Sequence, residues 1–309
     1  MTSLSRSGPV LMNIIAENQV PPQIASQIQL TLGYETSDMN TVTVDTAHFK
    51  DQGWVRVDNV VPVADCQAVV DTICEFWQVS RDGSHPARDG RERFNGIVPI
   101  HQHQTLWNTR QAPNLHQAFA EVHEQEALWV SMDRTSYKPR LSERAKAKPG
   151  DPNSIHTDKR LADKTFTVQG VLYLTDTPKD QGAWECVPDL YHEIREGKHE
   201  TIREGLDLSR YPIKRVPGKA GSVVIWHGHM PHGSGHNWRE TPRFVQYITM
   251  NQVGSEEDRL DRVKCWQSNR APHFWQGMPG QLDPEPWENP AALSPLGEML
   301  LGSRPWSAA

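Results

Sequence analysis

The sequence predicts a mainly β domain with flanking helices, built as a double-sheet barrel or jelly roll. From about residue 128, short runs of β-branched and aromatic residues are broken about every ten residues by Gly, Pro, Asp or Asn. Two stretches with helical periodicity precede these runs. Gly and Pro are frequent, at 21 and 23 of 309 residues, and only 37% of residues are hydrophobic. A loop-rich β fold explains this pattern better than a helical bundle does.

The first third of the chain supplies the flanking elements. Residues 1–41 show no sustained period and contain a Pro-Pro pair, so we expect an N-terminal arm on the domain surface. Alternation at 54–57 predicts a strand. Apolar residues near helical spacing predict helices at 64–77 and about 114–126.

The remaining elements form the predicted β core. Its clearest strand is 165–174, where even positions are apolar or small, so we expect that side to face inward. Further strands are expected at 183–187, 213–216, 222–226 and 243–250. We therefore expect one domain over 42–264, with 265–309 as a tail that wraps the same domain and includes a short helix near 293–301.

Composition limits the partners and the compartment. The net charge is −6 and the pI is near 6.2, so we expect no attraction to nucleic acid or to anionic membranes. No apolar run approaches the length of a membrane span, and the N-terminus carries no secretory signal core. The four cysteines are scattered, at Cys66, Cys74, Cys186 and Cys265. We expect reduced thiols in a cytoplasmic protein that is a monomer or homodimer.

His156-Thr157-Asp158 is the first candidate for chemistry. In an extended chain, residues two apart project from one face, so the imidazole and the carboxylate can bind one ion. Such a triplet alone is weak evidence. The triplet is stronger evidence for a metal site here because a turn-rich segment precedes it and a predicted buried strand follows it.

The second candidate is a strand end followed by a histidine and an arginine. The predicted strand at 222–226 leads to His232-Gly-Ser234-Gly, and Arg243 follows eleven residues after His232. Two histidines and one carboxylate occupy one face of an octahedral iron(II) and leave three positions open. Two of these can chelate the 2-oxo acid of 2-oxoglutarate and the third can admit O2. A buried arginine needs an anion, and the far carboxylate of 2-oxoglutarate would satisfy it.

The same motifs resemble those of the phytanoyl-CoA hydroxylase family, which includes ectoine hydroxylase. The matching residues are Phe49-x-x-x-Gly53-Trp54-Val55-x-Val57, Ser136-Tyr137-Lys138-Pro139, His156-x-Asp158, Gly170-Val171-Leu172-Tyr173-Leu174, Gly182-x-x-x-x-Val187-Pro188 and His232-Gly-Ser234-Gly with Arg243. The resemblance implies a double-stranded β-helix (cupin-like) core, Fe(II), 2-oxoglutarate as cosubstrate, O2, and stimulation by ascorbate.

The resemblance also assigns residues. It places the metal on His156, Asp158 and His232. It places the far carboxylate of 2-oxoglutarate on Arg243 and Ser234, with Ser136 and Val168 beside the cosubstrate. The chain departs from the family after Pro188, where relatives carry a glycine and this chain has Asp189-Leu-Tyr-His. Because Asp tolerates left-handed backbone, we expect a turn there, with an altered pocket rim.

The predicted function is hydroxylation of an unactivated C–H bond of a small molecule, with release of succinate and CO2. Related halogenases have a small residue in place of Asp158, so this chain should not chlorinate. Alternatives are a cupin-like hydrolase or isomerase that uses the same three ligands, and a catalytically silent jelly-roll binding protein. We expect His227, His229 and His236 to support the site or face solvent, and His101-Gln-His103 to be a loop feature near the substrate entrance.

Overall fold

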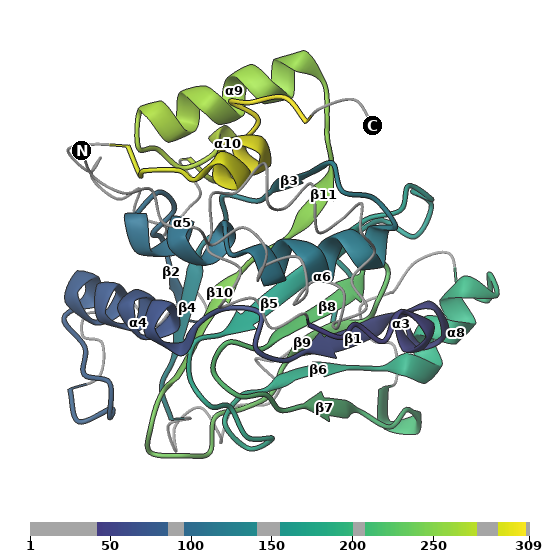
Figure 1. The fold of residues 1–309 in the computed structure, drawn as a ribbon. Helices are drawn as coiled ribbons and strands as arrows, with labels where there is room; N and C mark the ends of the chain where they lie inside the picture. The colour runs from purple at the N-terminus through teal and green to yellow at the C-terminus, as the bar shows by residue number, and fades with distance from the viewer. Residues whose placement is uncertain (1–41, 86–95, 141–154, 200–207, 277–289, 307–309) are drawn as a thin grey trace, which may run out of the picture.

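The fold is built on two facing antiparallel sheets, with helices packed outside the larger one and a further two-stranded sheet among the described residues (Figure 1). The computed structural model describes residues 42–85, 96–140, 155–199, 208–276 and 290–306. The predicted N-terminal arm, 1–41, lies outside the described residues.

The two sheets confirm the predicted jelly-roll class. The larger sheet has the order β1-β8-β5-β10-β4-β2, and the smaller has the order β7-β6-β9. The strands of the larger sheet are Trp54–Val57, Val223–His227, Val168–Tyr173, Arg243–Tyr247, Thr135–Lys138 and Ile97–Val98, in that order. Those of the smaller sheet are Lys214–Val216, Trp184–Cys186 and His232–Ser234. All neighbouring strands run antiparallel.

Both helices that the sequence predicted in the first part of the chain are present in the structure. These are α4 (Val63–Trp77) and α6 (Pro113–His123), and the predicted tail helix is α10 (Pro295–Leu301). Four further helices were not predicted: α3 (Thr46–Gln52), α5 (Gln104–Arg110), α8 (Pro188–Arg195) and α9 (Glu256–Gln267). Short 3-10 turns are η3 (Leu208–Arg210) and η4 (His273–Trp275).

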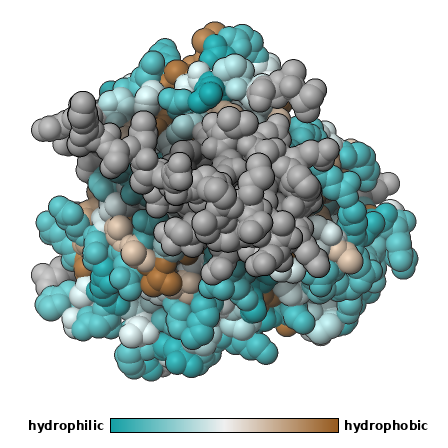
Figure 2. All heavy atoms as spheres, in the orientation of Figure 1, coloured by the Kyte–Doolittle hydropathy of each residue, from teal (hydrophilic) through white to brown (hydrophobic). Residues whose placement is uncertain are grey.

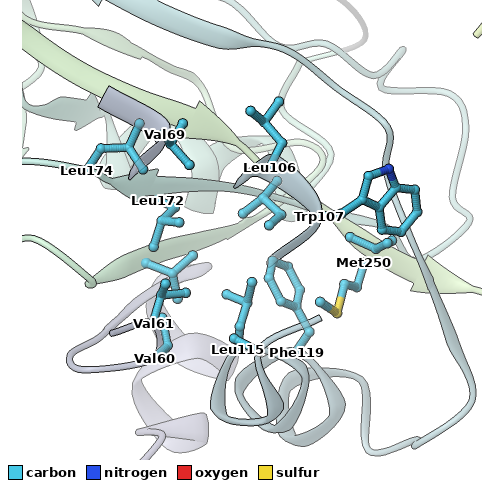
Figure 3. Close-up of a cluster of buried hydrophobic side chains, with 14 of the residues drawn as sticks. Val60, Val61, Val69, Leu106, Trp107, Leu115, Phe119, Leu172, Leu174 and Met250 are labelled. Carbon is cyan, nitrogen blue, oxygen red and sulfur yellow. The ribbon is translucent and has the colours of Figure 1, made fainter. Parts of the chain in front are cut away.

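The larger sheet is buried on both faces, by different partners. On its outer face, side chains such as Leu172 pack with Leu106 of α5 and with Leu115 and Phe119 of α6 (Figure 3). Full burial of side chains of this size contributes roughly 1.5–3 kcal/mol each. Gly170 permits the close approach, because a Cβ there would lie 2.8 Å from Phe119 Cζ and 2.5 Å from the Ile248 carbonyl oxygen.

The inner face of the larger sheet looks toward the smaller sheet. Val171, Tyr173, Val224 and Val245 pack there with Trp184. The odd positions of the predicted strand 165–174 therefore face the space between the sheets, and its apolar even positions lie under the helices. This reverses our expectation of which side faces the interior of the jelly roll.

Two predicted strands are shorter than expected. The strand predicted at 165–174 is regular only over Val168–Tyr173. The strand predicted at 243–250 is divided into β10 and β11 (Met250–Gln252), and β11 leaves the larger sheet to pair with β3 (Leu128–Val130).

The C-terminal segment is attached through α9 and α10, which lie together beside β3 (Figure 1). Ser255 and Asp258 form a capping box that begins α9. Arg262 donates to the carbonyl oxygens of Leu300 and Val130, so α9 connects the end of α10 to β3. Helix α9 runs across position 264–265, where the sequence placed the start of the tail.

The described surface carries few large exposed apolar side chains, and they are scattered rather than gathered into one patch. They are Val63, Phe166, Ile213, Trp238, Val253 and Leu260. In the view of Figure 2, the coloured part of the surface is mostly hydrophilic, with isolated brown side chains. Among the described residues, no helix has the length and apolar content needed to cross a membrane.

Candidate active site

A pocket of about 460 Å³ lies between the two sheets. Its walls are inner-face residues of β4, β5, β8 and β10, together with Trp184 of β6 and the strand β9. Trp275 of η4 brings the C-terminal segment to the same pocket, where its ring lies 3.4 Å from the guanidinium carbon of Arg134. All three predicted metal ligands and Arg243 line this pocket.

His156, Asp158 and His232 form the only group of three or more potential metal ligands within the part of the chain that the structure describes. Their ligand atoms all lie within 4.8 Å of one another. Asp158 Oδ1 is 3.4 Å from His156 Nε2, and Oδ2 is 3.5 Å from His232 Nε2. The structure therefore brings His232 to the His156-x-Asp158 pair, which lies far from it in the sequence.

Backbone pairing explains this convergence. His156 and His232 form an isolated antiparallel bridge, with reciprocal N–H to O distances of 3.0 and 2.9 Å. The bridge places the His-x-Asp segment beside β9. His232 Nδ1 lies 2.9 Å from the Met230 carbonyl oxygen, and an Nδ1–H tautomer donates to it. That tautomer leaves Nε2, which faces Asp158, as a metal ligand.

Asp158 is held as a carboxylate. Burial by itself raises the pKa of Asp158, but the facing imidazoles of His156 and His232 and the hydrogen bond from Gln169 outweigh that effect and hold the pKa well below its usual range. Gln169 Nε2 donates to Asp158 Oδ2 at 2.7 Å. The acid is therefore ready to bind a cation.

Arg243 is buried and has no acidic partner among the described residues. It is 2% exposed, and its Nη1 and Nη2 donate to the Gly182 carbonyl oxygen at 3.0 Å and to Ser136 Oγ at 3.2 Å. Its Nε is buried and has no hydrogen-bond partner within the residues that the structure describes. A buried guanidinium without a counter-charge is costly, so this end of the pocket suits an anionic ligand.

Lys138 adds a second cation at the same end, and the sequence interpretation missed its role. It is the cross-strand neighbour of Arg243, and its Nζ donates to Ser234 Oγ at 2.5 Å and to the Gly235 carbonyl oxygen at 3.0 Å. Lys138 and Ser136 lie two apart on β4 and share its inner face. Because Ser136 was already a candidate site residue, this two-residue spacing could have identified Lys138 from the sequence.

Val168 does not line the pocket, contrary to the prediction from resemblance. It is fully buried in the cluster under the helices, opposite His227 in the register of β5 and β8. Its neighbours Gln169 and Val171 line the pocket. The physical reason is the alternation of side chains along β5, which turns Val168 away from the site.

The other histidines singled out in the sequence have structural contacts. His101 Nδ1 lies 2.9 Å from the Met132 carbonyl oxygen, and His103 is the N-cap of α5. His227 packs against Tyr191, and burial lowers its pKa to about 4. Neither His227 nor His229 lines the pocket. The segment after Pro188, where we expected a turn, instead begins α8, with Pro188 in its first turn.

Comparisons with known proteins identify the family of this chain. A family model described as phytanoyl-CoA dioxygenase (PhyH) matches residues 49–245. A Dictyostelium discoideum protein that bears the name phytanoyl-CoA dioxygenase is 24% identical over 297 residues, which cover 72% of this chain and 83% of that protein.

Among solved structures, the hypothetical protein JW0805 from Escherichia coli matches with a TM-score of 0.55 at 16% identity, covering 95% of this chain and 90% of its own. That similarity supports the fold. The non-heme alpha ketoglutarate dependent epimerase SnoN from nogalamycin biosynthesis matches with a TM-score of 0.49 at 14% identity, covering 81% of this chain and 93% of its own.

Proposed function

The chain belongs to the phytanoyl-CoA dioxygenase family of iron(II)- and 2-oxoglutarate-dependent oxygenases, and on that premise we propose that it hydroxylates an unactivated C–H bond of a small-molecule metabolite. The observation that carries the proposal is the pocket itself. It holds a potential metal-binding triad and a buried guanidinium without a counter-charge in one cavity.

His156, Asp158 and His232 are the proposed iron ligands. Two imidazoles and one carboxylate suit iron(II) and leave coordination positions for other ligands. The ionised state of Asp158 and the backbone contact of His232 Nδ1 both favour metal binding through the facing atoms. When bound, iron(II) supplies the activation of O2 that is coupled to decarboxylation of 2-oxoglutarate into succinate and CO2.

Arg243 is the proposed anchor for the far carboxylate of 2-oxoglutarate. Its unpartnered Nε and the neighbouring Lys138 provide positive charge for that carboxylate, and Ser136 and Ser234 provide hydroxyl groups. Because Arg243 and the triad line the same pocket, a cosubstrate held by Arg243 would present its 2-oxo acid to the metal ligands. A hydrolase or isomerase that used the same triad would have no use for this second end.

The pocket wall beside His232 is apolar and buried. Trp184 and Trp226 are 3% and 4% exposed, and their rings lie 6.4 and 4.8 Å from the His232 ring. Apolar walls of this kind bind the carbon skeleton of a small substrate and strengthen the polar contacts around it. Because Asp158 occupies the carboxylate position, hydroxylation is favoured over halogenation. A cytoplasmic location remains a prediction from the cysteines.

The test is production of succinate. Purified protein is supplied with Fe(II), 2-oxoglutarate, ascorbate and O2, and succinate is measured with and without candidate metabolites. We expect slow succinate release alone, faster release with a substrate, and a product heavier by one oxygen atom. If no succinate forms with Fe(II), while Zn(II) or Mn(II) supports hydrolysis or isomerisation of a metabolite, the proposal is wrong.

A further inference from the structure

Two hydrogen bonds in series link a buried tryptophan to Asp158. The indole Nε1–H of Trp226 donates to Gln169 Oε1 at 3.0 Å, and Gln169 Nε2 donates to Asp158 Oδ2 at 2.7 Å. An indole N–H can only donate, so it fixes the amide with its oxygen toward Trp226. The amide nitrogen must then face the carboxylate. With the amide turned round, its NH2 group would face the indole N–H of Trp226. Its oxygen would then face the carboxylate oxygen of Asp158.

Trp226 is held firmly enough to act as the fixed end of this chain. It lies on β8 directly across from Gln169 on β5, and it is 4% exposed. Its ring lies 5.0 Å from the ring of Trp184 and 4.8 Å from that of His232. One side chain therefore contacts a proposed metal ligand directly and reaches a second through Gln169.

Asp158 has fewer restraints of its own. It lies outside the regular strands, and its side chain is 47% exposed. Packing alone therefore limits its rotamers only weakly. Of the hydrogen bonds to its carboxylate, the one from Gln169 comes from a group that is not itself a proposed metal ligand.

We propose that Gln169, oriented by Trp226, is a positioning residue that holds the Asp158 carboxylate in the orientation in which Oδ1 faces His156 and Oδ2 faces His232, so that the three side chains can bind one metal ion. This inference rests on the proposed function, because it assumes that Asp158 binds a metal. It goes beyond that function by assigning roles to two residues outside the ligand set. Outer-shell partners of this kind typically change metal affinity about 10- to 100-fold.

The experiment compares metal binding by four purified variants without 2-oxoglutarate or substrate. Gln169→Met removes both hydrogen bonds and keeps the side-chain length, and Trp226→Phe removes the donor and keeps a ring beside His232. The double variant combines the two. Trp54→Phe is the matched control, because Trp54 is a buried cross-strand neighbour of Trp226 whose Nε1 has no hydrogen-bond partner.

Co(II) serves as the probe, with its dissociation constant from calorimetry and its ligand-field spectrum as the readouts. We expect Gln169→Met to weaken Co(II) binding about 10- to 100-fold and to change the spectrum. Trp226→Phe should weaken binding about tenfold or less, and the double variant should bind about as well as Gln169→Met alone. Trp54→Phe should stay within about twofold of the wild type.

Each other outcome has a distinct meaning. If Gln169→Met binds Co(II) like the wild type, the positioning role is overturned and the metal site stands. If the Gln169 and Trp226 effects simply add, Trp226 acts through its ring on His232 and the link through Gln169 is overturned. If the wild type binds no Co(II), the metal site fails and the inference fails with it. Trp226→Phe keeps the test decisive if Gln169→Met does not fold.

Discussion

The two ends of the pocket are held by very different amounts of structure. At the metal end, the side chains of His156 and Asp158 are 51% and 47% exposed, and their segment joins β9 through one isolated bridge. At the other end, Arg243 is 2% exposed on β10, which has strands paired on both sides. The arginine end is therefore preformed, whereas the metal end depends on a few contacts and on the ion that its ligands share.

The two ends of the pocket also differ in charge. Asp158 accepts hydrogen bonds from its neighbours and is kept ionised, so the metal end is ready for a cation. Arg243 donates only to neutral oxygens among the described residues, and Lys138 places a second cation beside it, so the other end is ready for an anion. A ligand that binds a metal at one end and carries a carboxylate at the other satisfies both. This comparison can be tested by disrupting one end at a time.

The largest effect is expected from Asp158→Ala. Removing a direct ligand should weaken Co(II) or Fe(II) binding by more than about 100-fold, the upper range for losing an outer-shell partner, and should abolish succinate production. Calorimetry with Co(II) and a succinate assay measure both. Asp180→Ala is the control, because Asp180 forms an exposed ion pair with Arg239 away from the pocket. Metal affinity retained by Asp158→Ala would remove Asp158 from the ligand set.

The next effect is expected at the arginine end, from Arg243→Met. We expect the KM for 2-oxoglutarate to rise about 100-fold, because charge-assisted hydrogen bonds are lost, while Co(II) affinity changes less than about threefold. Stability without ligand should not fall, since a buried guanidinium without a counter-charge is replaced by an apolar chain. The rise in Tm on adding 2-oxoglutarate should disappear.

Arg239→Met is the matched control for Arg243→Met, because Arg239 is an arginine on the surface with its side chain 49% exposed. It should leave the KM for 2-oxoglutarate unchanged. An equal rise in the KM values for 2-oxoglutarate and for the primary substrate in Arg243→Met would argue against the assigned role of Arg243.

The sequence could predict the site residues that are identified by their spacing along the chain. It could not predict those that depend on contacts between strands. The His-x-Asp spacing and the step from His232 to Arg243 are local, so the chemistry-bearing residues were predictable. Gln169 and Lys138 act through residues on neighbouring strands. The register between two strands cannot be read from the spacing of residues along one of them. Val168 was misplaced because the resemblance put it beside the cosubstrate, whereas its side chain lies on the face of β5 that the helices bury.

The missed helices have a similar explanation. Helix α9 is strongly charged, and only Cys265 on it is buried, so no apolar stripe marked it. Its stability comes from a capping box and from Arg262, whose partners lie on other elements. Helix α8 begins at Pro188, and its next residues lie where the family comparison suggested a turn.

The smallest effects should come from the residues around Arg243. Lys138→Met should raise the KM for 2-oxoglutarate about tenfold, because one cation is lost from a site where Arg243 remains. Ser136→Ala should raise it only a few-fold, since Ser136 Oγ accepts one hydrogen bond from Arg243 Nη2 and carries no charge of its own. Both variants are titrated with 2-oxoglutarate at fixed Fe(II) and then with Co(II) alone. Because these side chains are on β4, whereas the triad is on β9 and the segment paired with it, Co(II) affinity should stay within about threefold. A loss of metal affinity in Lys138→Met as large as its loss of 2-oxoglutarate affinity would mean that the two ends are coupled before any ligand joins them.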